Sequence, residues 1–233
     1  MADAPTVAAE RAPAEPVADD EGAATETGPS PLDATPEEPP RSRLPEAIAT
    51  VVVVVAGTAL ILSALSPSLL VTDTTPAGGD MGAHVWGPAF LRDSLLPQGR
   101  LSGWAPDWYA GFPAYHFYMV VPSLAIVGLD VALPYGIAFK LVTVAGLLAL
   151  PAAAWALGRA ARVPFPGPAL LAVGAVGFLV DRSFTIYGGN VASTLAGEFA
   201  FSISLALALA FLALVLRGLE TGRHRASAAA ALG

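Results

Sequence analysis

Residues 47–72 read AIATVVVVVAGTALILSALSPSLLVT and contain no charged side chain. An α-helix rises 1.5 Å per residue, so a stretch of this length is long enough to cross a hydrocarbon core of about 30 Å. Three further uncharged stretches follow, at residues 141–158, 163–180 and 199–216. Only 13% of the 233 residues are charged, and four such stretches in so short a chain indicate an integral membrane protein.

The N-terminal segment differs sharply in composition from the rest of the chain. Residues 1–40 are acidic, rich in Pro and Ala, and free of aromatic residues, and most of the formal net charge of −7 arises there. Such a segment cannot bury enough apolar surface to offset its ordering entropy. We therefore predict a disordered cytoplasmic tail over residues 1–44, too long and acidic to open a cleaved signal peptide, followed by a retained signal anchor. The chain has no cysteine, which excludes disulfides, thiolate metal sites and a cysteine nucleophile.

Basic residues predict which loops face the cytoplasm, where Lys and Arg concentrate. The count depends on whether residues 118–133 cross the membrane. This segment is apolar but short, and it is either a short span or a helix lying at the membrane surface. If it does not cross, seven basic residues lie inside and four outside, and if it crosses the count is inverted. The inside set is then Arg41, Arg43, Arg159, Arg162, Arg217, Arg223 and Arg225, and the outside set is Arg92, Arg100, Lys140 and Arg182. The count favours the arrangement in which this segment does not cross.

The predicted fold is therefore all-α, a polytopic transmembrane helical protein of the cell membrane with a cytoplasmic N-terminus. Residues 45–225 form the transmembrane domain, with spans at about 47–71, 135–158, 163–181 and 197–217. The extracytoplasmic loops are a long first loop, 72–134, and a short one, 182–196. Lys140 lies near the outer end of its span and is expected to reach the interface with its amine. Residues 226–233 read ASAAAALG and predict the start of a further helix, so the chain is expected to be part of a longer protein.

The long outer loop collects acidic, basic and aromatic side chains. Its stretch GGDMGAHVWGPAFLRDSLL, residues 78–96, has the apolar spacing of a short amphipathic helix. Asp80 occupies the position of an N-cap, and His84 falls one turn later on the same face. In the simplest interpretation Asp80 only caps this helix, His84 is structural, and the aromatic residues form an interfacial belt.

The same residues also allow a chemical interpretation, in which they bind and activate a substrate. A partly desolvated carboxylate such as Asp80 suits a general base at a membrane surface. Guanidinium groups pair bidentately with phosphate, which makes Arg92 and Arg100 candidate phosphate ligands. Aromatic faces suit the apolar faces of sugars while their polar tips stay wet. The candidate substrate-binding residues of this loop are His84, Arg92, Arg100, Trp104, Trp108, Tyr109 and His116.

The second outer loop adds Tyr187, Asn190 and Glu198 to the candidate binding residues. Glu198 stands at the start of the fourth span, and ionisable groups at such depths are costly and often functional. Asn190 and Glu198 could bind sugar hydroxyls or hold a donor phosphate through a divalent cation, although the sequence indicates no metal site or other cofactor. In the alternative interpretation, Glu198 caps its own helix and pairs with Arg182.

Several of these stretches resemble a known family. An N-terminal anchor followed by a long outer loop with an early acidic residue resembles the GT-C class of membrane glycosyltransferases. The stretches GGDMGAH (78–84), LPQGRLSGWAPDWYAGFPAY (96–115) and YGGNVASTLAGEFAFSISLAL (187–207) are more specifically similar to YfhO-like and 6-pyruvoyl-tetrahydropterin synthase-related bacterial membrane proteins. The resemblance covers about residues 47–225 and implies a polyprenyl-phosphate-linked sugar donor and a catalytic Asp80. Here Met81 follows Asp80, where the commoner pattern has two adjacent acidic residues.

The predicted function is a glycosyltransferase acting on the extracytoplasmic face in cell-envelope glycan or lipid assembly. Its expected partners are membrane lipids, the polyprenyl-phosphate sugar donor and a glycan or lipid acceptor, with no nucleic acid. The alternatives are a non-catalytic membrane scaffold and a transporter component, each with a partner-binding outer loop. The scarcity of charge within the spans argues against the transporter.

Overall fold

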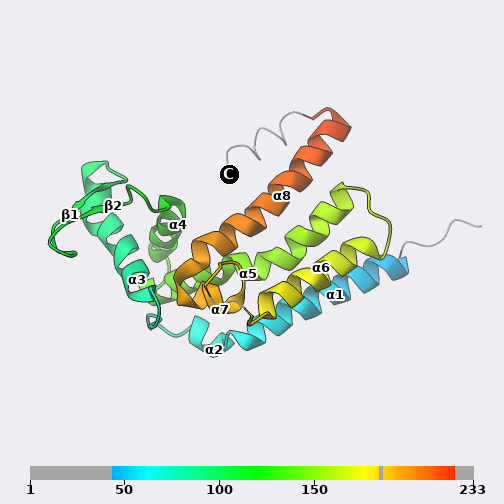
Figure 1. The fold of residues 1–233 in the computed structure, drawn as a ribbon, viewed down its shortest axis with the longest axis horizontal. Helices are drawn as coiled ribbons and strands as arrows, with labels where there is room; N and C mark the ends of the chain where they lie inside the picture. The colour runs from blue at the N-terminus through cyan, green and yellow to red at the C-terminus, as the bar shows by residue number, and fades with distance from the viewer. Residues whose placement is uncertain (1–43, 184–185, 224–233) are drawn as a thin grey trace, which may run out of the picture. The chain divides into compact units, whose positions relative to one another are not determined.

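The computed structural model describes residues 44–183 and 186–223, and this part of the chain is mostly helical (Figure 1). The long helices are α1 (Leu44–Ala64), α5 (Tyr135–Ala160), α6 (Gly167–Val180) and α8 (Phe199–Thr221). The short ones are α2 (Pro67–Leu70), α3 (Met81–Phe90), α4 (Val120–Asp130) and α7 (Val191–Ser193). The predicted tail up to residue 43 and the predicted further helix over 226–233 lie outside the described residues.

Within the described residues, three helical stretches are long and apolar enough to cross a membrane, namely α1, α5 and Val191–Thr221, which includes α8. The helix α6 is apolar but starts at Gly167, four residues after the predicted start of the span 163–181, because Pro164 and Pro166 precede it and proline lacks the N–H that a helix interior needs. Its 14 residues rise only about 21 Å, which is less than a hydrocarbon core of about 30 Å.

The first span also ends earlier than the sequence suggests. The helix α1 ends at Ala64 rather than near residue 71, because Ser66 takes a positive φ of 54° and Pro67 begins the separate helix α2. The helix α5, in contrast, lies within two residues of the predicted span 135–158.

The helix α5 is the centre of the packing, and it contacts α1, α4, α6 and α8. One apolar core cluster joins four elements through Ile61 of α1, Leu147 of α5, Leu179 of α6 and Ala206 of α8. The helices α5 and α8 approach closely at Gly146, where a Cβ atom would lie only 2.3 Å from the carbonyl carbon of Ser202. Small residues allow helices to approach in this way where lipid removes the hydrophobic drive for association.

The two loops predicted to lie outside meet at the same end of the long helices. There α3 contacts α4, and the strands β1 (Gly103–Ala105) and β2 (Phe112–Ala114) lie between them in the chain (Figure 1). The backbone N–H of Asp80 donates to the carbonyl oxygen of Ala196 at 2.8 Å, which ties the first loop to the second. At the other end of the helices Arg162 pairs with Glu220 at 2.7 Å, joining the turn after α5 to the end of α8.

Two features of the long loop refine the predicted fold class. The strands β1 and β2 form an antiparallel pair with Trp104 opposite Pro113, so the loop holds a small sheet that an all-α class does not include. The uncertain segment 118–133 contains α4, whose 11 residues rise about 16 Å and are too few to cross a bilayer. It contacts α3 and α5.

Lys140 is buried instead of extending toward the interface, which corrects the expectation from its position near the helix end. Its ammonium group donates to the backbone oxygens of Leu69 and Thr72 and to the hydroxyl of Thr74. These three bonds use all three donors of the amine. Lys140 therefore fastens the segment after α1 onto the first turns of α5.

We expect Lys140→Met to lower the melting temperature of the purified protein in detergent. The substitution keeps an unbranched side chain but removes the donor of the two hydrogen bonds to the backbone oxygens of Leu69 and Thr72. A hydrogen bond typically contributes about 0.5–1.5 kcal/mol to stability. Thermal unfolding followed by circular dichroism measures the effect. Arg159→Gln, at an exposed position of the same helix, is the control and should leave the melting temperature unchanged. Equal melting temperatures for the Lys140 variant and the wild type would show that the segment does not depend on this amine.

Candidate functional site

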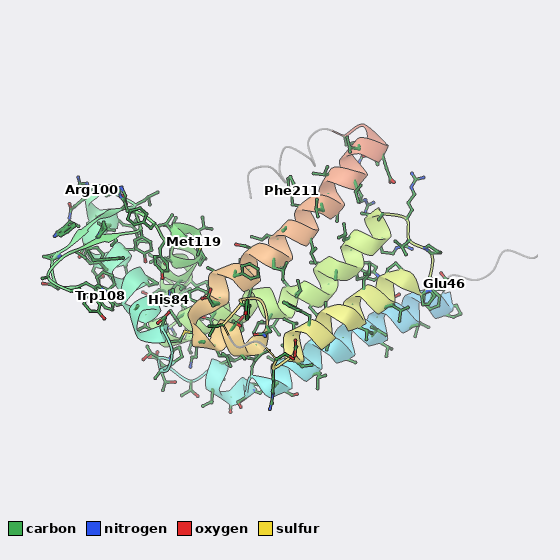
Figure 2. All side chains as sticks on the ribbon, in the orientation of Figure 1. Glu46, His84, Arg100, Trp108, Met119 and Phe211 are labelled. Atoms are coloured by element: carbon green, nitrogen blue, oxygen red, sulfur yellow. The ribbon has the colours of Figure 1, made fainter. Side chains whose placement is uncertain are left out.

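A cavity of about 320 Å³ lies among α3, α4, the segment between β1 and β2, and the first turn of α8. This volume is at the lower end of the range for small-molecule sites. Its aromatic walls are Trp86, Trp108, Tyr109, Phe112, Tyr115, Tyr118 and Phe199, and its polar side chains include Asp80, His84 and Ser123. In Figure 2, His84 lies on α3 near the start of α8, and Trp108 lies in the segment between the strands. The cavity therefore combines aromatic walls with an acid and a histidine.

The start of α3 places Asp80 and His84 one turn apart, as the spacing predicts. The backbone N–H of His84 donates to the carbonyl oxygen of Asp80 at 3.2 Å. Asp80 is at the N-cap position, but its side chain does not form the capping hydrogen bond. The expectation that the carboxylate only caps the helix is therefore not supported, and this exposed carboxylate is available to a ligand.

Two glycines allow the first loop to lie directly on the second. A Cβ atom at Gly79 would lie 2.2 Å from the carbonyl oxygen of Ala196. A Cβ atom at Gly197 would lie 3.1 Å from the Cβ of Asp80 and 3.2 Å from the Cδ2 of His84. Gly197 also has a φ of 133°, which residues with a side chain rarely adopt. The close approach puts the Asp80–His84 turn beside the residue that precedes Glu198.

The electrostatic surroundings of His84 follow from this arrangement. Burial lowers the pKa of His84, while the neighbouring carboxylates of Asp80 and Glu198 act in the opposite direction and only partly offset it. The imidazole also contacts the ring of Tyr118 edge-on, at 5.8 Å between centroids, and that of Phe199 at 5.1 Å. Because its pKa lies below the ordinary 6.5, His84 is neutral at neutral pH and can both donate and accept a hydrogen bond.

The aromatic walls are held in place by contacts with one another. Trp86 lies 4.8 Å from Trp108, between ring centroids, and stacks on Phe90 at 4.9 Å. The hydroxyl of Tyr115 donates to the Oγ of Ser123 at 2.9 Å, and burial raises the pKa of Tyr115 to about 12. Tyr115 is therefore uncharged across the physiological range, and the wall presents neutral rings.

The two arginines predicted to bind phosphate do not reach the cavity. The guanidinium of Arg92 contacts the carboxylate of Asp93, at 2.6 Å, and that of Asp130, so two acids compensate its charge. Arg100 is exposed in the turn after the residues Leu96–Gln98 and lies outside the lining. Among the described residues that line the cavity there is neither lysine nor arginine.

Several other predicted residues lie apart from the cavity. Trp104, His116 and Tyr187 are exposed and do not belong to the lining. Asn190 is buried, and its side-chain oxygen accepts the backbone N–H of Ser193 at 2.8 Å, which caps α7. Its role in the structure is therefore that of a helix cap.

Glu198 is exposed and does not itself line the cavity, although Phe199 next to it does. Its carboxylate lies near enough to His84 to oppose, in part, the lowering of the imidazole pKa by burial. Within residues 44–183 and 186–223 no ion pair joins Glu198 to Arg182, so the pairing considered from the sequence is not formed. Of the predicted residues, Asp80, His84, Trp108 and Tyr109 are in the lining, and Glu198 stands beside it.

Sequence reasoning did not select Trp86, Tyr115, Tyr118 or Phe199 as binding residues. Residues 80, 83, 84 and 87 are spaced by three or four along α3 and all line the cavity, so helical spacing from Asp80 could have indicated this face. The two tyrosines belong to the aromatic-rich stretch of the first loop, but no local signal distinguishes the rings that line the cavity from those that do not. Phe199 reaches the site only through tertiary packing.

No protein-family model, curated protein or solved structure matches the chain. Within the described part of the chain, no group of three His, Cys, Asp or Glu residues is placed to hold a metal ion. The geometry defines the class of site as an aromatic cavity with a carboxylate and a neutral imidazole, beside the first turn of an apolar helix.

Proposed function

We propose that the chain is a membrane glycosyltransferase, or the part of one that carries its acceptor-activating residue. It takes a sugar from a polyprenyl-phosphate-linked donor on the extracytoplasmic face and transfers it to a cell-envelope glycan or lipid. The observation that supports this proposal most directly is the cavity in which the free carboxylate of Asp80 and the neutral His84 face aromatic walls. Aromatic rings bind the apolar faces of sugars, while carboxylates accept hydrogen bonds from their hydroxyl groups.

In the proposed reaction, the carboxylate of Asp80 accepts the proton of the acceptor hydroxyl. The hydroxyl oxygen then forms a bond to the anomeric carbon of the donor sugar. The bond from that carbon to the phosphate oxygen breaks, and its electron pair leaves with the phosphate. A base needs to lie within hydrogen-bond reach of the proton that it removes. Asp80 is exposed and lines the cavity, which supports this role.

The positions of the two arginines change the predicted location of the donor phosphate. Because Arg92 is already paired with two carboxylates and Arg100 is remote from the lining, the cavity lacks the cations that a phosphate would need. We therefore assign the sugar to the cavity, with the phosphate of the donor outside it.

We expect Trp108→Ala to weaken binding of a polyprenyl-phosphate sugar by about tenfold, which corresponds to about 1.4 kcal/mol. The reason is that Trp108 supplies a ring of the cavity wall and contacts both Trp86 and Tyr109. Binding of a panel of such donors to the purified protein can be followed by calorimetry. Trp104→Ala is a matched control in the same loop, because Trp104 lies outside the lining.

The proposal requires the two tryptophan variants to differ. Equal affinity of both variants and the wild type would place the sugar elsewhere, and an equal loss in both would point to a general disturbance of the loop.

A further inference from the structure

The edge of the cavity carries a group of exposed apolar side chains, Phe117, Tyr118, Met119 and Val121, which we call the apolar rim. Their exposed fractions are 82% for Phe117, 54% for Tyr118 and Met119, and 67% for Val121. No charged residue occurs between residues 117 and 129. A contiguous group of large apolar side chains facing water is unfavourable, and it marks an interaction surface.

Part of the apolar rim lines the cavity, together with the first turn of the apolar helix α8. Tyr118 and Met119 line the cavity together with Phe199 and Ala200, which form the first turn of α8. The stretch that contains α8 is one of the three long enough to cross a membrane. One wall of the cavity is thus made by the start of a candidate span and another by the rim.

That candidate span also carries exposed apolar side chains near its start. Leu195 and Phe201, on either side of the α8 start, are 45% and 47% exposed, so apolar side chains also face outward there. The helix α4, which includes Val121 of the rim, packs on the start of the candidate span α5 through the buried cluster of Ile126 and Phe139. Exposed apolar side chains therefore occur both on the rim and around the start of α8, and both segments line the cavity.

The chemistry of the rim fits lipid as its partner. Phe and Tyr with aliphatic neighbours are typical of segments that enter the headgroup and upper acyl region of a bilayer. Asp130, the charged residue of α4, is paired with Arg92 of η1 (Leu91–Leu95) and does not project alone toward lipid. Arg100, in contrast, lies at the end of this region farthest from α8 in Figure 2.

We infer that the apolar rim is embedded in the outer part of the bilayer, so that the cavity opens sideways to lipid as well as to water. A ligand with a hydrocarbon chain then reaches the Asp80–His84 end of the cavity along the membrane, with its chain passing the rim beside α8. The embedding itself is independent of the proposed glycosyl transfer, because it rests only on the exposed side chains of the rim and on the cavity lining that the rim shares with the start of α8.

The absence of cysteine from the chain makes a depth measurement direct. Single cysteines replace Phe117, Met119, Val121 and, as control, Arg100, in the full chain. Each is labelled with a nitroxide, and the protein is reconstituted in vesicles of phosphatidylcholine and phosphatidylglycerol. Power saturation then compares collisions with oxygen, which concentrates in lipid, and with a water-soluble nickel chelate.

We expect oxygen collisions to dominate at positions 117, 119 and 121 and nickel collisions to dominate at position 100. Dominant nickel collisions at the three rim positions would overturn the inference by placing the rim in water. Exclusion of both reagents would also overturn it, because a second protein surface and not lipid would then cover the rim. No substrate is needed, so the result stands whether or not the proposed transferase activity is found.

Discussion

Asp80→Asn is expected to reduce glycosyl transfer by about 10²–10⁴-fold, the contribution of a positioned general base. Asparagine keeps the size of the side chain but cannot accept a proton at neutral pH. The protein should still fold, because the contact of residue 80 with Ala196 is made by the backbone N–H and asparagine is equally favourable at an N-cap. Transfer from a panel of polyprenyl-phosphate sugars by protein in vesicles measures the effect, alongside donor binding.

Asp107→Asn provides the matched control, because Asp107 is an exposed carboxylate of the same loop that does not line the cavity. Its variant should transfer at the wild-type rate. If the Asp80 variant transfers as fast as the wild type, Asp80 is not the base, and Glu198→Gln becomes the next variant because Glu198 is the other carboxylate near His84.

Gly197→Ala is expected to separate the two loops that form the site. The new Cβ would lie within 3.1–3.3 Å of Asp80 and His84, and the φ of 133° would be strained for alanine at a cost on the order of 1–3 kcal/mol. Both effects are relieved if residue 197 moves away from the start of α3. The variant should therefore lose transfer together with part of its thermal stability.

The titration of His84 gives a readout of this separation that does not depend on activity. Burial is the main cause that lowers the pKa of His84, so opening the contact should raise that pKa toward its ordinary 6.5. The chain has three histidines, which keeps an NMR titration simple to assign. Gly222→Ala is the control, because Gly222 also has a positive φ but no atom within 4 Å of an added Cβ. An unchanged His84 titration in the Gly197 variant would contradict the proposed contact.

The apolar helices could be predicted from the sequence because their signal is local. The length and charge-free composition of a stretch determine whether it can cross a bilayer, and α5 lies within two residues of its predicted bounds. The boundaries were missed where proline and backbone geometry intervene. Ser66 and Pro67 end α1 early, and Pro164 and Pro166 delay α6 until it is too short for a simple span.

Only part of the candidate site could be predicted from the sequence. The Asp80–His84 pair follows from helical spacing, and the structure places both in one cavity. The roles of Arg92 and Asn190 could not be inferred, because their partners determine them. Arg92 is paired with Asp130, 38 residues away, and Asn190 caps a helix.

The sequence by itself therefore determined that this is a chain of apolar helices with an acid, a histidine and many aromatic rings concentrated between the first two. It also predicted that Asp80 and His84 share a helix face, since helical periodicity is a property of neighbouring residues. Only the tertiary structure decided which rings enclose the pair and which cations are already neutralised. The contact of Gly197 with Asp80 and His84 joins positions more than a hundred residues apart, and such contacts depend on how the helices pack.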